Sequence, residues 1–168
     1  GSVVTFESGE DNSTELNGFT ITNGVAVYYG GGINILYASP SLKNLIIKNN
    51  SAHDAGGMRI YGTADAQENL TISNLIVSGN EAVNGEGGGI KCYYVTLNIY
   101  DSDILNNIAY KGGGIYLSDS NLSLFNSQVD NNTSGKDGAG IYTNNSHISI
   151  INSSLSNNHS DNNGTIFL

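Results

Sequence analysis

This chain of 168 residues has very little of several residue types on which common protein architectures depend. Its single cysteine, Cys92, excludes an internal disulfide framework and a thiolate metal cluster. It contains one proline and no tryptophan, and no apolar run approaches the roughly 20 residues that span a bilayer. We therefore expect no membrane insertion by this segment.

Basic residues are also scarce, with 6 Lys and Arg against 15 Asp and Glu and a formal net charge of −9. An acidic surface repels phosphate backbones and anionic lipid headgroups, so nucleic acid is not expected as a partner. His, Cys, Asp and Glu do not occur at metal-ligand spacing. We predict no metal site and no cofactor, and a weak surface calcium site on Asp or Asn bends stays open.

Glycine is abundant, with 22 residues, and it recurs at a regular period together with asparagine. The motif Gly112-Gly113-Gly114-Ile115 has copies along nearly the whole chain, and each copy ends on an apolar anchor. Successive anchors lie 25, 32, 25, 26 and 25 residues apart. The anchors are Ile33, Met58, Ile90, Ile115, Ile141 and Ile166. A period of this length is the signature of a solenoid.

Each repeat also carries a second motif, represented by Leu124-x-Asn126-x-x-Val129-x-Asn131-Asn132. Around it, apolar and polar residues alternate over short spans, which is the period of a half-buried strand. No window of a dozen residues has apolar residues at helical spacing. We therefore expect about three short strands in each repeat.

A strand-only repeat of this size cannot bury its own apolar side chains, whereas stacked repeats can. The sequence predicts an all-β fold, a right-handed single-stranded parallel β-helix of about six coils. Residues 1–168 would form one domain, as part of a longer repeat protein. The predicted interior ladders are Ile33/Met58/Ile90/Ile115/Ile141/Ile166, Ile35/Ile60/Cys92/Leu117/Thr143/Leu168, Leu16/Leu42/Ile72/Ile99/Leu124/Ile150 and Ile21/Ile47/Val77/Ile104/Val129/Leu155.

The first Asn of the second motif forms a predicted structural column at the bends. An Asn side chain there can bond to bend backbone and to its copy one coil away. The column consists of Asn44, Asn74, Asp101, Asn126 and Asn152, with Gly18 in the first copy.

Two insertions interrupt the period, five residues within 62–69 and two around 83–86. Insertions in solenoids become surface loops, which either bind a partner or have no function. Arg59 with Asp65 and Glu68 is the best candidate for lyase chemistry, which needs a base and carboxylates. A salt-bridged surface cluster is the other interpretation, and no residue is assigned as catalytic.

Tyr116 and Tyr142 each follow an anchor by one position, so they should stack outward with Phe167 next in line. Aromatic surfaces suit sugars and protein partners. Alternatively, the rings simply pair with their neighbours across the strands. The candidate surface-binding residues are Arg59, Asp65, Glu68, Tyr93, Tyr116 and Tyr142.

Both motifs together resemble the repeats of chlamydial polymorphic membrane proteins and methanogen adhesin-like proteins, which carry Gly-Gly-Ala-Ile and Phe-x-x-Asn. Counterparts are Gly87–Ile90, Gly112–Ile115, Ile104-x-x-Asn107 and Val129-x-x-Asn132, with Gly replacing Ala and aliphatics replacing Phe. The resemblance implies a non-enzymatic, adhesin-like module of a larger cell-surface or secreted protein. Its partner would be a protein or glycan of a host or neighbouring cell.

β-Helices also resemble polysaccharide lyases and hydrolases, so a polysaccharide-active enzyme or its carbohydrate-binding remnant is the alternative. A hydrolase needs two carboxylates that face each other across a cleft. Asp101 is a candidate for one of them, but it already belongs to the bend column and is expected to have a structural role there. Strand edges at both ends of the rod would favour end-to-end association of copies.

Overall fold

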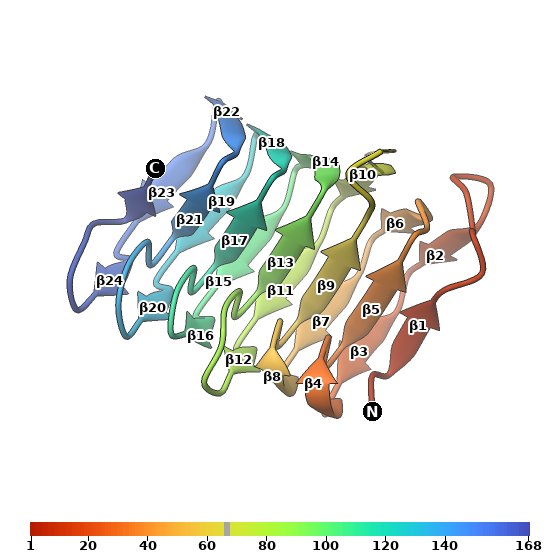
Figure 1. The fold of residues 1–168 in the computed structure, drawn as a ribbon, viewed down its shortest axis with the longest axis horizontal. Helices are drawn as coiled ribbons and strands as arrows, with labels where there is room; N and C mark the ends of the chain where they lie inside the picture. Colours follow the sequence, from red (N-terminus) through yellow and green to blue (C-terminus); the bar gives the residue numbers. More distant parts are fainter. Residues whose placement is uncertain (66–67) are drawn as a thin grey trace.

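The computed structural model describes residues 1–65 and 68–168, which form 25 short strands in four parallel sheets (Figure 1). The chain visits the sheets in a constant order, so that one strand from each sheet makes a coil. Six coils are complete, and the first strand of a seventh follows. The chain is therefore a parallel β-solenoid, as the repeats predict. Within the described residues, no helix is long and apolar enough to cross a membrane.

The longest strands of the third to sixth coils belong to sheets A and B. Sheet A consists of β1 (Val4–Phe6), β5 (Ile33–Leu36), β9 (Met58–Tyr61), β13 (Ile90–Tyr93), β17 (Ile115–Ser118), β21 (Ile141–Asn144) and β25 (Ile166–Phe167). Sheet B consists of β2 (Glu15–Asn17), β6 (Ser41–Lys43), β10 (Glu68–Ser73), β14 (Val95–Tyr100), β18 (Asn121–Phe125) and β22 (His147–Ile151).

The other two sheets complete the coil. Sheet C consists of β3 (Thr20–Thr22), β7 (Ile46–Lys48), β11 (Ile76–Ser78), β15 (Asp103–Leu105), β19 (Gln128–Asp130) and β23 (Ser154–Ser156). Sheet D consists of β4 (Val25–Tyr29), β8 (Ser51–Asp54), β12 (Glu81–Ala82), β16 (Ile108–Ala109), β20 (Thr133–Ser134) and β24 (His159–Ser160).

The expectation of about three strands per repeat was wrong, because sheet D supplies a fourth. Most of its strands have only two residues, too few to produce an alternating pattern. Each strand turns one small side chain inward, such as Ala52 and Ala82, which are both 2% exposed. A small residue lets the chain pass close to the core at this tight side of the coil.

The predicted interior ladders are present. Ile90 pairs with Ile115, and Ile115 pairs with Ile141, in register along sheet A. The sheet B and sheet C ladders also align throughout. The exception is Leu168, which lies beyond β25 with its side chain 81% exposed.

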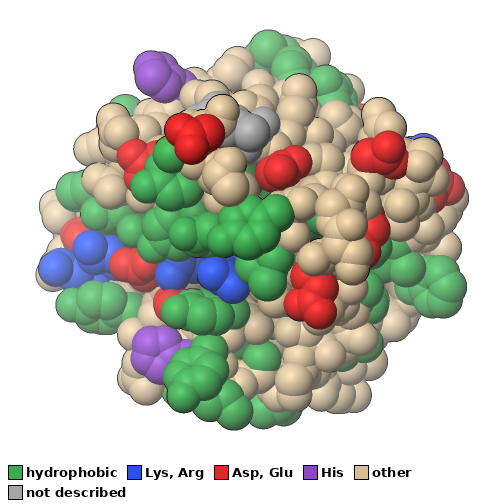
Figure 2. All heavy atoms as spheres, turned by 45° about the vertical axis from the view of Figure 1, so that its right-hand side comes forward, with side chains coloured by type: hydrophobic (Ala, Val, Ile, Leu, Met, Phe, Trp, Pro, Cys, Tyr) green, Lys and Arg blue, Asp and Glu red, His purple; other side chains and the backbone are tan. Residues whose placement is uncertain are grey.

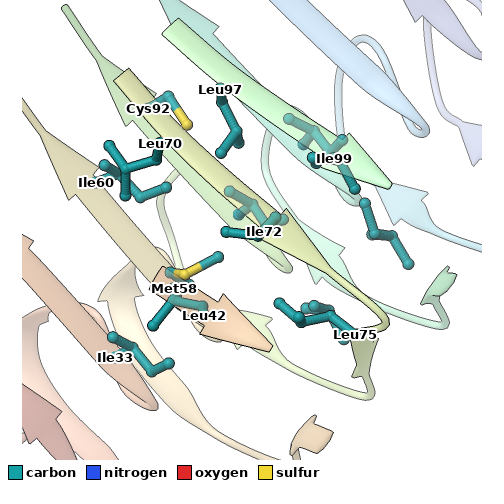
Figure 3. Close-up of a cluster of buried hydrophobic side chains, with 14 of the residues drawn as sticks. Ile33, Leu42, Met58, Ile60, Leu70, Ile72, Leu75, Cys92, Leu97 and Ile99 are labelled. Atoms are coloured by element: carbon teal, nitrogen blue, oxygen red, sulfur yellow. The ribbon is translucent and has the colours of Figure 1, made fainter. Parts of the chain in front are cut away.

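Aliphatic side chains from sheets A, B and C fill the interior as a single cluster (Figure 3). The labelled residues Met58, Ile72 and Leu97 point into the space that the sheets enclose. Cys92 lies among them, and burial raises the pKa of its thiol. A thiol that stays protonated is a poor nucleophile, so Cys92 acts as a core residue.

A second interior column is polar and consists of asparagine side chains. Asn80 donates through its amide to the Ile47 carbonyl (2.9 Å) and to Asn107 Oδ1 (3.0 Å). Its own Oδ1 accepts from the backbone and side-chain N–H groups of Asn50, at 3.1 and 3.0 Å. Buried amides need such partners, since an unsatisfied group costs about 1–3 kcal/mol. The ladder consists of Asn50, Asn80, Asn107, Asn132 and Asn158.

This ladder lies against the glycine motif, so the two sequence motifs meet in space. A Cβ added to Gly89 would lie 2.6 Å from the Gly114 carbonyl oxygen and 3.0 Å from Asn107 Nδ2. Gly112, two residues before Gly114, has φ +62°, which also favours glycine. Only glycine lets this corner approach both the next coil and the ladder.

The bend column that the sequence singles out is a different, exposed one. Its members have φ between 48° and 79°, a left-handed conformation that Asn, Asp and Gly tolerate best. Adjacent members bond to each other in part, as when Asn126 Nδ2 donates to Asp101 Oδ1 at 3.3 Å. The buried amides that join the coils belong to the last Asn of the motif, six residues further along.

Replacing Asn107 with alanine tests the buried ladder. The change leaves two N–H groups of Asn80 without their acceptor and removes the donor to the Val77 carbonyl. We expect the free energy of unfolding in urea to fall by about 3 kcal/mol. In the control Asn98→Ala, one exposed bond to Asn69 is lost, and the change should stay within about 0.5 kcal/mol. Equal effects of both variants would contradict the role of the ladder.

Gly89→Ala tests the close approach, because its new methyl group would collide with the Gly114 carbonyl of the next coil. We expect the free energy of unfolding, measured in urea, to fall by about 3 kcal/mol. Gly135→Ala is the matched control, since its Cβ would meet nothing nearer than Tyr110 at 3.8 Å. The control should be neutral or slightly stabilising. A stable Gly89 variant would show that the corner can relax.

Candidate binding face on sheet A

Strict register lines up the outward side chains of sheet A in two columns. One column follows each anchor by one position and contains Arg59, Lys91, Tyr116, Tyr142 and Phe167. The other lies two positions further and contains Tyr61 and Tyr93. Figure 2 shows a band of hydrophobic side chains across this part of the surface, with basic and acidic side chains along one side of it. We call this surface the sheet A face.

The predicted aromatic stack is present at one end of the sheet A face. Tyr116 and Tyr142 stack with ring centroids 5.0 Å apart and planes 4° apart, and Tyr142 stacks on Phe167 in the same way. The ring faces therefore contact one another, and the Tyr116 side chain is only 6% exposed. A sugar could reach the ring edges and hydroxyls but could not stack on these faces.

Cations also lie close to these rings. Lys91 Nζ lies 5.2 Å from the Tyr93 ring centroid and 5.4 Å from that of Tyr116. Lys111 Nζ lies 4.8 Å from the ring centroid of Tyr142. Such contacts contribute about 0.5–2 kcal/mol each, depending on desolvation. The sheet A face is thus held together by its own aromatic and cationic side chains.

Lys91 forms a buried ionic cluster that the sequence analysis missed. Its side chain is 4% exposed, and its Nζ lies 3.0 Å from Asp54 Oδ1 and 3.1 Å from Glu86 Oε2. The backbone N–H of Glu86 donates to the same Asp54 oxygen at 2.8 Å. Asp54 and Glu86 each lie four residues before an anchor. Alignment of the repeats at this position was the signal that could have revealed the cluster.

The cluster sets the protonation of its members. Burial opposes charge on Lys91, but Asp54 and Glu86 together raise the pKa of its ammonium above the ordinary value. Burial is the main cause that raises the pKa of Tyr93 and of Tyr116. At neutral pH Lys91 is therefore charged and both hydroxyls are neutral, so none of the three is a ready base.

Arg59 does not form the predicted cluster with the inserted loop. Its guanidinium carbon lies 4.0 Å from the Tyr29 ring centroid and 4.8 Å from that of Tyr61. Within the described part of the chain, Arg59 forms no ion pair. Asp65 is exposed on the loop, while Glu68 begins β10 and accepts a hydrogen bond from Ser39 Oγ. Positions 66 and 67 of the predicted loop at 62–69 lie outside the described residues.

A pocket of about 300 Å³ opens beside Arg59. It is bordered by the rings of Tyr29 and Tyr61 on sheets D and A, and by Tyr94 at the corner after β13. Asp54 and Lys91 form its charged wall. Of the predicted surface residues, Arg59 and Tyr93 line this pocket, whereas Tyr116 and Tyr142 belong to the stack.

No group of three or more His, Cys, Asp or Glu in residues 1–65 and 68–168 could hold a metal ion. Comparison with protein-family models, curated proteins and solved structures finds no match to this chain. The parallel sheets themselves define the chain as a β-solenoid. The resemblance to chlamydial polymorphic membrane proteins and methanogen adhesin-like proteins has no support from a family match.

Lys91→Met tests the ionic cluster through its pH dependence. The folded-state pKa is raised, so the stabilisation is complete below the unfolded pKa of about 10.4 and is lost as pH rises through the folded pKa. At pH 8 the free energy of unfolding of the variant should be lower by about 3 kcal/mol, because two carboxylates lose their partner. This difference in unfolding free energy between the variant and the unmodified protein, measured in urea, should become smaller at alkaline pH.

The control for this measurement is Lys48→Met, which removes an exposed lysine from sheet C. Its stability should follow that of the unmodified protein at every pH. A Lys91 variant whose deficit stays constant throughout the alkaline range would show that Lys91 acts by packing alone.

Proposed function

We propose that this chain is a non-enzymatic structural module of the adhesin type, displayed outside the cell as part of a larger protein. The observation that carries the proposal is the buried Asn ladder against the glycine corner. It ties every coil to the next through satisfied amide bonds, for example from Asn80 to Asn107 and from Asn107 to Asn132. Such a stack suits an extended, rigid support that holds a surface at a distance.

The charged groups of the sheet A face support a binding role over a catalytic one. Lys91 is paired with two carboxylates, and its raised pKa keeps it protonated. Proton abstraction next to a uronate needs a neutral base. The guanidinium of Arg59, the other candidate, packs against two tyrosine rings. Both cations are better placed to bind than to take up a proton.

The partner in this proposal is a protein or glycan on a host or neighbouring cell. The net charge of −9 favours neutral or locally matched ligands over polyanions such as nucleic acid. The aromatic stack offers hydroxyls and ring edges, not open ring faces, to that partner. Binding at the sheet A face would therefore depend on hydrogen bonds and on Arg59, which has no carboxylate partner among the described residues.

A polysaccharide lyase or hydrolase is the rival function, favoured by the pocket that brings Arg59, Lys91 and Asp54 together. Incubation with polygalacturonate, alginate and neutral polysaccharides, with and without calcium, separates the two. We expect no unsaturated sugar ends and no new reducing ends above the heat-denatured control. The proposal would be overturned if the unmodified protein cleaved one of these polysaccharides and if Arg59→Ala or Asp54→Asn, in folded protein, abolished the cleavage.

A further inference from the structure

We propose that the pocket beside Arg59 binds a single carboxylate-bearing sugar unit of the uronic acid class. The proposal builds on the adhesive function above and names the ligand chemistry at the sheet A face. It starts from Arg59, whose guanidinium lies between the rings of Tyr29 and Tyr61. No hydrogen-bond acceptor or carboxylate among the described residues contacts this guanidinium. Its five N–H donors are thus available in a fork that the two rings hold in place.

A planar fork of this kind matches a carboxylate, which accepts two parallel hydrogen bonds. The charges around the pocket are balanced. Lys91 is paired with two carboxylates, Asp54 and Glu86, at 3.0 and 3.1 Å, so these three groups and Arg59 sum to zero, and Arg59 is the pocket cation without a carboxylate contact among the described residues. A zwitterionic amino acid would bring an ammonium to an Asp54 that is already paired. The guanidinium of Arg59 is therefore the contact for one carboxylate, and the nearby Asp54 disfavours a second negative charge on the ligand.

The rest of the lining suits hydroxyl groups. Asp54 Oδ1 accepts from Lys91 and from the Glu86 backbone, whereas Oδ2 accepts no hydrogen bond from the described residues and lies 3.8 Å from His53 Nδ1. That oxygen can accept a hydrogen bond from a sugar hydroxyl, and the hydroxyls of Tyr61 and Tyr94 offer further partners. A volume of about 300 Å³ lies at the small end for ligand sites, which fits one ring.

The corner between sheets A and B places one more tyrosine at the pocket. Tyr94 has φ +52° there, as does Tyr37 at the same corner after β5, whereas the later coils have Asp119 (+50°) and Asn145 (+49°). Asp and Asn tolerate this left-handed conformation, whereas a bulky aromatic residue is strained in it. The strain places a tyrosine ring at the edge of the pocket, 6.5 Å from the Tyr61 ring. Tyr37 shares the conformation without lining the pocket, so it is the position of Tyr94, and not its backbone, that adds a ring to the pocket.

Titration of the labelled chain followed by NMR tests the assignment. D-Galacturonate and D-glucuronate should shift the signals of pocket residues saturably, and methyl galactoside should bind at least several-fold more weakly. Arg59→Gln removes the fork and should weaken uronate binding roughly tenfold or more. Arg59→Lys keeps the charge without the fork and should also bind more weakly. Lys48→Gln, an exposed charge change on sheet C, is the matched control and should bind normally.

Spectra of each variant without ligand show whether it is folded, and Tyr94→Asn provides a second test that relieves the backbone strain. This variant should be at least as stable as the unmodified chain and yet bind uronate less tightly. Glutamate, an acidic peptide or inorganic sulfate binding more tightly than both uronates would overturn the assignment. So would uronate binding that is unchanged in Arg59→Gln.

The outcomes also distinguish this proposal from the adhesive function. If no uronate binds but polysaccharides are not cleaved, only the assignment of the pocket fails. If uronate polymers bind at Arg59 and are cleaved there, the pocket assignment stands and the non-enzymatic function fails.

Discussion

Amide hydrogen bonds inside the solenoid, along one column of asparagines, are the constraint on which the rest of the structure depends. Each buried amide uses its donors and its acceptor on the coils before and after it, as Asn80 does with Ile47, Asn50 and Asn107. A buried amide that missed its neighbour would cost about 1–3 kcal/mol, so the ladder strongly disfavours any shift of one coil against the next. Glycine at the facing corner is the second half of the same constraint, because a side chain there would separate the coils.

Fixed register determines the surface as much as the core. Since each coil follows the last in phase, outward residues from distant parts of the sequence become neighbours along the axis. Lys91 on β13 meets Tyr116 on β17 and Asp54 at the end of β8 in this way. The sheet A face is therefore a product of the repeat geometry, and a change in its chemistry requires only substitution at outward positions, which leaves the ladder untouched.

Periodicity made the coil and the four interior ladders predictable, apart from Leu168, since residues such as Ile90, Ile115 and Ile141 recur at a regular spacing and remain apolar. The fourth strand was not predictable because two residues, such as Glu81–Ala82, cannot show an alternation. Spacing also could not tell which asparagine turns inward, because Asn74 and Asn80 recur with the same period. The position of Arg59 depends on a choice between loop carboxylates and tyrosine rings, and that choice is made by side-chain packing in three dimensions.

On a parallel solenoid, the aromatic rings of one column tend to stack on one another. Coils repeat at roughly 4.8 Å, and the rings of Tyr116, Tyr142 and Phe167 are 5.0 Å apart, so each ring covers the face of the next. A ligand that needs an open ring face finds none within such a stack. A pocket arises where the column changes from rings to cations, at Arg59 and Lys91, because a cation packs on a ring and still keeps its polar atoms for other partners. The pocket proposed as a binding site therefore lies at the interruption of the aromatic column and not along its length.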